Sequence, residues 1–414
     1  MLNPIPSLCR LMQRTYRIVV ASVVVAAIFV ALTFTPTANH ALAQSSVTIN
    51  GAGATFPYPL IDTWRIEYGK QNPVNINYQS IGSGGGIKQF GEMTVDFGAS
   101  DAPMTQAQRE NLNGAVVVHI PETIGSVVAV YNVPEVPEKG LKLTGGVLSE
   151  IFLGKIKMWD DPKIKELNPE MSLPSEDITV VHRSDGSGTT FVWTSYLSIV
   201  SQEWDDAIGR GTSVQWPTGI GSPGNEGVAN SVKSTPYSIG YVELAYALTT
   251  KMTYAFLQNH DQSNFVEPTL ESTRQAVEAM TTTLPKGEES WEELSLLDAP
   301  GENSYPIASF SYILLYKDLS TNPSISKEKA DAIVRFVSWA VTEGQQYSEQ
   351  LSYVPLPSAV VDHNLETLRS LTYKETSLAT AVVPEFHVMA ALVLASALVS
   401  IIAIQRSMRS ARQV

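Results

Sequence analysis

"VVHRSDGSGTTFVW" (Val180 to Trp193) is the stretch that decides the expected fold. The run "ITVVHR" that ends at Arg183 has the apolar pattern of a strand, and "TTFVWTSYLSIV" from Thr189 has a helical pattern. The same order occurs in "VTING" followed by "LIDTWRIEYGKQ". Strands that alternate with helices from about residue 47 to 365 predict an α/β fold, and the lack of a fixed-period repeat excludes a solenoid.

The turn inside this stretch is unusually rich in hydrogen-bond donors. It holds Arg183 and Asp185, two glycines, and four hydroxyl residues, which are Ser184, Ser187, Thr189 and Thr190. A helix that begins there presents free N–H groups and the positive end of its dipole, which suits an oxyanion. Asp185 is close enough along the chain to hold the Arg183 guanidinium in place, although it is also a common turn former.

Three further loops have the same chemistry. They are "GAGATFP" (Gly51 to Pro57), "IGSGGGIKQF" (Ile81 to Phe90) and "VDFGASDAP" (Val95 to Pro103), the last followed by a capping box in "TQAQ" (Thr105 to Gln108). A turn of this kind before a helix is often ordinary capping. Four of them in one chain, one with an arginine, predict a shared anion-binding site.

These loops, together with "IFLGKIKMWDDP", "GNEGVA" and "IGYVELAYA", resemble the phosphate-binding proteins of high-affinity phosphate ABC importers, in the same order over about residues 48–365. The resemblance implies a two-lobed periplasmic-binding-protein-like fold of type II, with lobes joined by two crossing strands and inorganic phosphate between them. The implied partners are the permease subunits of the importer and, indirectly, its ATPase. The implied ligand contacts are Thr55, Phe56, Ser83, Asp101, Arg183, Ser187, Gly188 and Thr189, with Phe56 and Gly188 acting through their backbone N–H groups.

Asp101 is the residue expected to select the anion. A carboxylate repels an oxyanion unless the ligand brings a proton, which phosphate does near neutral pH and sulfate does not. Sulfate would leave a buried acceptor facing acceptor oxygens, at a loss of at least ~1–3 kcal/mol. We therefore expect phosphate to be preferred.

Charge and composition exclude several other classes. The formal net charge is −13, and without the six arginines near the two ends and Glu385 the body has 22 basic and 40 acidic residues, a net charge of −18. Such a body repels nucleic acid, so no nucleic-acid partner is expected. Cys9 is the only cysteine and the six histidines are scattered, so we expect no intrachain disulfide, no metal and no cofactor.

Two enzymatic interpretations are weaker. Ser187 lies in "DGSGT", which lacks the first glycine of a nucleophile elbow, and His182 would face the opposite side of a strand from Arg183. "GIGSPG" (Gly219 to Gly224) matches a dinucleotide fingerprint in form, but it follows "VQWPT" and contains Pro223. We therefore expect no enzymatic activity.

Both ends of the chain carry apolar runs. Three arginines, the run Ile18 to Phe34 and "HALA" predict a signal peptide cleaved before Gln44, with a permanent membrane helix as the alternative. Val388 to Ile404, followed by arginines, predicts a membrane anchor that leaves the body outside, whereas a buried core helix is the alternative. "PEF" before this run also resembles the PEF-type sorting signals of some archaeal surface proteins, so the run is either retained or processed.

The expected organisation follows from these segments. The chain is divided into a signal peptide (1–43), a first lobe in two parts (44–126 and 308–365), a second lobe (127–307), a linker (366–387), a transmembrane or sorting helix (388–404) and a basic cytoplasmic tail (405–414). "SVVAVYNV" (Ser126 to Val133) and "ASFSYILLYK" (Ala308 to Lys317) are the expected crossing strands. The acidic stretch Pro285 to Asn303 is expected to be a solvated loop or surface helix. We expect the protein at the extracytoplasmic face of the cell membrane, anchored there.

Overall fold

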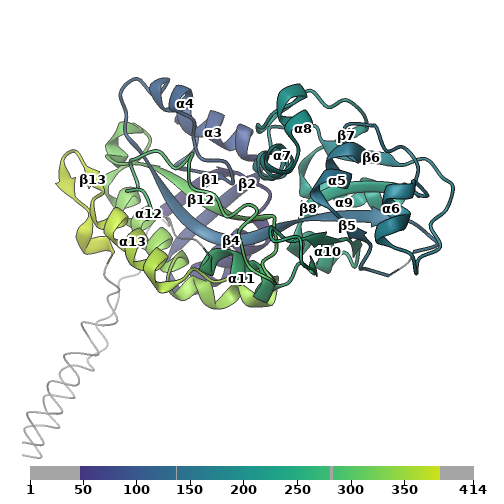
Figure 1. Cartoon of the computed structure of the whole chain (residues 1–414). Coiled ribbons are helices and arrows are strands. Elements are labelled where there is room, and N and C mark those ends of the chain that lie inside the picture. Colours follow the sequence, from purple (N-terminus) through teal and green to yellow (C-terminus); the bar gives the residue numbers. More distant parts are fainter. Residues whose placement is uncertain (1–46, 137, 280–282, 383–414) are drawn as a thin grey trace, which may run out of the picture. The chain divides into compact units, whose positions relative to one another are not determined.

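The central sheet is organised around one long strand, β4 (Val117–Asn132). The computed structural model describes residues 47–136, 138–279 and 283–382, and Figure 1 shows β4 running between two groups of elements. Every residue of β4 except Asn132 is buried, as expected for a strand rich in valine and isoleucine that is covered on both faces. The strand begins nine residues before the predicted run at Ser126.

The first half of the sheet has the order β2-β1-β3-β12-β4, and the second half continues from β4 to β8, β6 and β7, with β9 also paired to β4. β4 pairs with β12 over Val117 to Ser126 and with β8 over Val127 to Asn132. Ala308, the first residue of β12, pairs with Ser126. Both predicted crossing runs are therefore sheet strands, and β4 is the one that continues into the second half.

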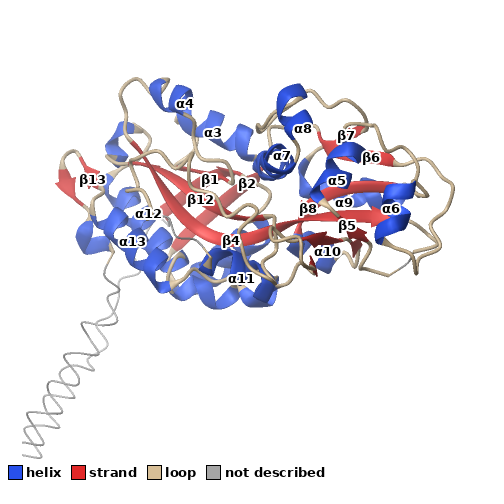
Figure 2. Ribbon diagram, viewed as in Figure 1, coloured by secondary structure: helices blue, strands red, loops and turns tan. Residues whose placement is uncertain are grey.

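Strands and helices alternate along both halves, which confirms the predicted α/β fold (Figure 2). The first half contains β1 (Val47–Gly53), α2 (Tyr58–Gln71), β2 (Val74–Ser80), α3 (Ser83–Gly91), β3 (Phe97–Ser100), α4 (Gln106–Glu110), β12 (Ala308–Tyr316), α12 (Lys327–Ala340) and α13 (Ser358–Arg369). The second half contains β6 (Thr179–Arg183), α7 (Gly188–Val200), β7 (Ile220–Ser222), α9 (Gly224–Ser234), β8 (Ser238–Glu243), α10 (Leu244–Thr249) and β9 (Thr253–Tyr254).

Smaller elements complete the described part of the chain. They are α5 (Gly145–Phe152), α6 (Pro162–Leu167), α8 (Gln202–Ala207), α11 (Leu270–Glu278), a three-stranded sheet of β5 (Lys142–Leu143), β10 (Phe256–Gln258) and β11 (Phe265–Val266), and the hairpin of β13 (Thr372–Tyr373) and β14 (Thr376–Ser377). Short 3-10 turns occupy Leu319–Thr321, Glu343–Tyr347, Glu349–Leu351 and Ala379–Ala381. The capping box predicted at Thr105 and Gln108 is present at the start of α4.

Two expectations about loops are wrong. Residues 366–382 are not a linker, because α13 continues to Arg369 and the side chains of Leu371 and Leu378 are fully buried. The acidic stretch Pro285 to Asn303 forms no helix and is only partly solvated. Its Trp291 is buried and packs against His119, Tyr312 and His363. The apolar spacing of that stretch gave no indication of this contact with the first half.

The predictions for the two ends fall outside the described residues. This applies to the signal peptide at 1–43, to the run at 388–404 and to the tail at 405–414. Across the part of the chain that the structure describes, none of the helices has the length and apolar character needed to cross a membrane.

Candidate functional site

Four helices begin at the place where the two halves of the sheet meet. Ser83 and Gly188 are the first residues of α3 and α7, and Gly224 is the first residue of α9. Thr55 and Phe56 lie just before α2. The contacts described below join all four starts, so the N–H groups of several first turns lie near one another.

Arg183 is the cation of this site. It ends β6, and its guanidinium side chain is only 1% exposed. Its Nε and Nη2 donate to the two carboxylate oxygens of Asp185 at 2.8 and 2.5 Å, while Nη1 donates to Thr55 Oγ1 at 3.2 Å and lies 3.5 Å from Thr189 Oγ1. Asp185 thus fixes one edge of the guanidinium, and the other edge points to the two threonines.

Asp185 is held as a carboxylate. Burial opposes its ionisation, but the bonds from Arg183 and from the Gly224 N–H at 3.1 Å lower its pKa. The carboxylate therefore connects the loop after β6 with the start of α9. The stretch "GIGSPG" contributes this Gly224 donor.

Asn225 is a site residue that the sequence prediction missed. Its Nδ2 donates to Thr55 Oγ1 at 2.7 Å and to Thr189 Oγ1 at 3.1 Å, and its Oδ1 accepts from the Glu243 N–H at 3.0 Å. The side chain is fully buried. The hydroxyl oxygens of Thr55 and Thr189 already accept a hydrogen bond from Asn225. The hydrogen of each hydroxyl is therefore available to donate to a ligand. The motif "GNEGVA" was the available signal, but it did not identify the asparagine.

The loop Ala54 to Phe56 is oriented by three tyrosines. The carbonyl oxygens of Ala54, Thr55 and Phe56 accept from the hydroxyls of Tyr78, Tyr246 and Tyr353 at 2.8, 2.6 and 2.6 Å. A trans peptide holds its C=O and N–H on opposite sides, so the N–H of Phe56 points away from Tyr246. The Phe56 ring itself is buried in the core.

The loops of the two halves touch at Gly188. A β-carbon built on Gly188 would lie 2.4 Å from Ser83 Oγ and 2.5 Å from Asp101 Oδ2, so no other residue fits there without displacement. Nearby, the Gly84 N–H donates to the Gly186 carbonyl at 2.8 Å. Ser187 caps α7 by accepting from the Thr190 N–H at 3.0 Å, which leaves its hydroxyl hydrogen to donate.

Asp101 is the acceptor in this set of donors. Its side chain follows β3 and is 1% exposed, and its Oδ1 accepts from Ser311 Oγ at 2.9 Å. Its Oδ2, beside Gly188, has no hydrogen-bond partner among the described residues. Burial raises the pKa of Asp101 to about 7, although the hydrogen bond from Ser311, the attraction of Arg183 and the nearby Thr189 hydroxyl each lower it.

The structure therefore brings the eight residues expected from the sequence into one cluster. Thr55, Ser83, Asp101, Arg183, Ser187 and Thr189 are each no more than 3% exposed. His182 lies outside the cluster and stacks on Trp216 with ring centroids 4.8 Å apart. The cluster offers one cation, hydroxyl and N–H donors, and a single uncommitted carboxylate oxygen, which suits an oxyanion that carries a proton.

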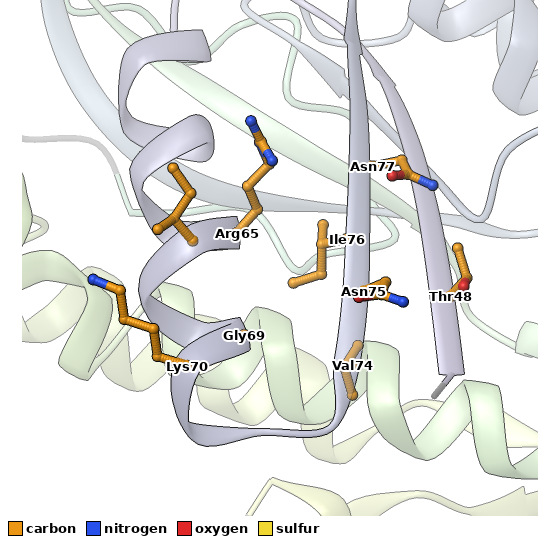
Figure 3. Close-up of a pocket in the computed structure, with 9 residues that line it drawn as sticks. Thr48, Arg65, Gly69, Lys70, Val74, Asn75, Ile76 and Asn77 are labelled. Carbon is orange, nitrogen blue, oxygen red and sulfur yellow. The ribbon is translucent and has the colours of Figure 1, made fainter. Parts of the chain in front are cut away.

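A cavity of about 460 Å³ lies away from this cluster, between α2 and the edge strand β2 (Figure 3). Its two cations are already paired, Arg65 with Asp62 and Lys70 with Glu67. Figure 3 shows the Lys70 side chain pointing away from β2. This cavity lacks converging donors and is the weaker candidate.

Comparisons with known proteins identify the family of the chain. Residues 38–343 match the family model described as a PBP superfamily domain. The chain is 46% identical over 328 residues to the phosphate-binding protein PstS of Pasteurella multocida, covering 78% of this chain and 90% of that protein. It is 42% identical over 341 residues to the protein of the same name from Methanocaldococcus jannaschii, covering 79% and 87%.

Solved structures share the fold at lower identity. A phosphate-binding protein from Stenotrophomonas maltophilia aligns with a TM-score of 0.60 at 20% identity, covering 77% of this chain and 92% of that chain. The phosphate-bound PfluDING protein also aligns with a TM-score of 0.60, at 17% identity, covering 79% and 99%. The solved structures show a shared fold, and the sequence relatives and the family model show that this chain belongs to the PstS family of phosphate-binding proteins, within the PBP superfamily.

Proposed function

We propose that the chain binds inorganic phosphate outside the cytoplasm and delivers it to the permease subunits of an ABC importer. The observation that carries the proposal is the buried Asp101 Oδ2, which faces the donors around Arg183 without a partner of its own. A phosphate that carries a proton satisfies both kinds of group at once. The PstS relatives support the same ligand, because they are named as phosphate-binding proteins.

In the proposed complex each residue has a defined role. Arg183 neutralises the anion, and the hydroxyls of Thr55, Ser83, Ser187 and Thr189 donate to its oxygens. The N–H groups of Phe56 and Gly188 donate as well, at the starts of α2 and α7. Asp101 accepts the proton of the ligand. Phosphate leaves this site chemically unchanged, so the proposed role is binding and transfer rather than catalysis.

The proposed location follows from the ends of the sequence. The arginines and apolar run before Gln44 support export, and the run at Val388 to Ile404 supports an anchor that keeps the body near its permease. Mass spectrometry of the mature protein tests both ends. An N-terminus at Gln44 and a C-terminus that includes residues 388–404 are the expected results for cleavage and for a retained anchor.

Calorimetry on the purified full chain tests the ligand. We expect one phosphate per chain with a dissociation constant of about 1 μM or tighter, equivalent to about −8 kcal/mol. Sulfate at the same concentration should give little heat. Binding of sulfate without binding of phosphate would refute the proposal.

A further inference from the structure

The buried carboxyl of Glu122 lies next to the site, and nothing in the proposed binding scheme uses it. Glu122 is in β4 and is fully buried. Its Oε1 lies 3.1 Å from Ser311 Oγ, and its Oε2 has no hydrogen-bond partner in the described residues. No salt bridge within the part of the chain that the structure describes includes this side chain.

The position of Glu122 in the sheet is irregular. Ser311 of β12 pairs with Thr123, but the next residue, Tyr312, pairs with Pro121, so Glu122 is the extra residue of a β-bulge. Bulges commonly re-aim a side chain near a functional site. The carbonyl of Glu122, which the bulge frees from the ladder, accepts from Gln345 Nε2 at 3.0 Å. The bulge thus directs the Glu122 carboxyl to Ser311, and the hydrogen bond from Gln345 stabilises the bulged backbone.

Counting hydrogens at Ser311 restricts the charge of its neighbours. Asp101 Oδ1 and Glu122 Oε1 lie 2.9 and 3.1 Å from the same Ser311 Oγ, which has one hydrogen to donate. If both carboxyls were ionised, one oxygen would face the hydroxyl with no hydrogen between them. One of the two carboxyls must therefore be protonated and donate to Ser311.

The surroundings identify Glu122 as the protonated one. Burial, together with the negative charge of Asp101, raises the pKa of Glu122 to about 8, although the bond from Ser311 acts in the opposite direction. Asp101 has the Arg183 cation as a neighbour. Among the described residues, Tyr78, Tyr312 and Tyr353 also lie near this pair, and burial raises the pKa of each phenol so that it stays neutral. Glu243 is a further buried carboxyl nearby, whose Oε2 accepts from the Ala245 N–H and whose pKa is raised by burial.

We propose that Glu122 is a positioning residue for anion selectivity: its neutral carboxyl donates to Ser311, which donates to Asp101 and keeps Oδ2 of that carboxylate free to accept the ligand's proton. This inference rests on the proposed phosphate site. It adds to that site a residue, Glu122, that does not contact the ligand. The acid, the hydroxyl and the carboxylate form one directed chain of hydrogen bonds. Its direction is what excludes an unprotonated oxyanion.

Infrared difference spectroscopy on the ligand-free full chain tests the protonation state without using phosphate. Between about pH 7 and about pH 8, where Asp101 is ionised and Glu122 is protonated, wild type minus Glu122→Gln should contain the C=O stretching band of a protonated carboxyl group. The absence of that band, or its appearance in wild type minus Asp101→Asn instead, would overturn the proposal. This result is independent of whether phosphate binds, so it separates failure of this inference from failure of the proposed function.

Binding measurements test the consequence for selectivity. Glu122→Gln keeps a neutral donor at the same place, so its ratio of phosphate to sulfate affinity should stay within about twofold of wild type. Ser311→Ala removes the link and should lower the ratio roughly tenfold, because Asp101 loses the bond that favours its ionised form. Ser309→Ala is the matched control on β12, since the Ser309 hydroxyl donates to the neighbouring Phe310 carbonyl and to no other group among the described residues. An unchanged ratio in Ser311→Ala would contradict the proposal.

Discussion

At the scale of single residues, we propose that Asp101 determines which anion the site accepts. Its Oδ2 is buried beside Gly188 and lacks a donor among the described residues. A ligand with a hydrogen supplies that donor, whereas a fully deprotonated anion meets repulsion. Selectivity therefore arises from a group that rejects the wrong ligand more than from one that attracts the right ligand.

Asp101→Asn should weaken this rejection. An amide donates where the carboxylate accepts, so sulfate affinity is expected to rise by roughly tenfold or more, while phosphate affinity changes less. Competition calorimetry with the two anions measures both constants. Sulfate rejection that stays at the wild-type level would contradict the proposed role of Asp101.

Sulfate binding by the wild-type protein should depend on pH in a defined direction. The pKa of Asp101 is raised to about 7, so the ligand-free site holds a carboxylate above that pH and a neutral acid below it. Only the neutral acid donates to sulfate. Sulfate affinity should thus be constant at low pH and fall about tenfold per unit above about pH 7. Titrations in Asp101→Asn, which does not ionise at this position, should lack that fall.

The sequence revealed some of these residues and hid others, for a physical reason. Arg183, Ser187 and Thr189 are close in the chain, and their donors all belong to one turn, so the local pattern was sufficient. Asn225 and Glu122 reach the site only because α9 and β4 pack there. The local sequence around a single asparagine or glutamate does not indicate such a contact. The bulge at Glu122 depends on pairing with a strand almost 190 residues away in the sequence.

At the scale of elements, local patterns predicted the strands and helices better than their ends. β1, α2, β6 and α7 lie where the apolar periodicity placed them. β4 is longer than expected because "PET" (Pro121 to Thr123) interrupts its apolar run, and the bulge accommodates these residues without ending the strand. Pairing on both sides, which a single sequence does not display, overrides the local signal.

The segment after α13 is the clearest case of a wrong element. Small and polar residues suggested a linker, but Leu371 and Leu378 are fully buried and the Val382 carbonyl accepts from Ser338 Oγ at 3.2 Å. Burial of two isolated leucines leaves no periodic pattern to detect. The segment completes the first half of the fold.

Leu378→Ala should therefore destabilise the body. Truncating a fully buried leucine costs about 2–5 kcal/mol, whereas the same change in a solvated linker costs almost nothing. Denaturant unfolding of the full chain measures the difference, and Thr376→Ala, an exposed position in the same segment, is the control. Equal stability of the two variants would show that this segment is a solvated linker and not part of the folded body.

At the scale of the whole sheet, the site depends on how its two halves meet. Arg183 from the second half bonds Thr55 from the first, Gly84 bonds Gly186, and Gly188 leaves no space beside Ser83 and Asp101. The site residues are almost wholly buried in this arrangement. We therefore expect binding and release to separate the halves.

We expect that separation to be a rotation about the point where β4 changes partner, between Ser126 and Val127. The loops that hold the donors lie on either side of this point. In the proposed complex, phosphate bridges the two sets of donors and therefore favours the closed form. Small-angle scattering of the purified full chain should show compaction on addition of saturating phosphate, and none with Arg183→Ala, which removes the cation while sparing β4. If the wild-type scattering curve is the same with and without phosphate although calorimetry shows binding, entry occurs by local loop motion, and the rotation about β4 is wrong.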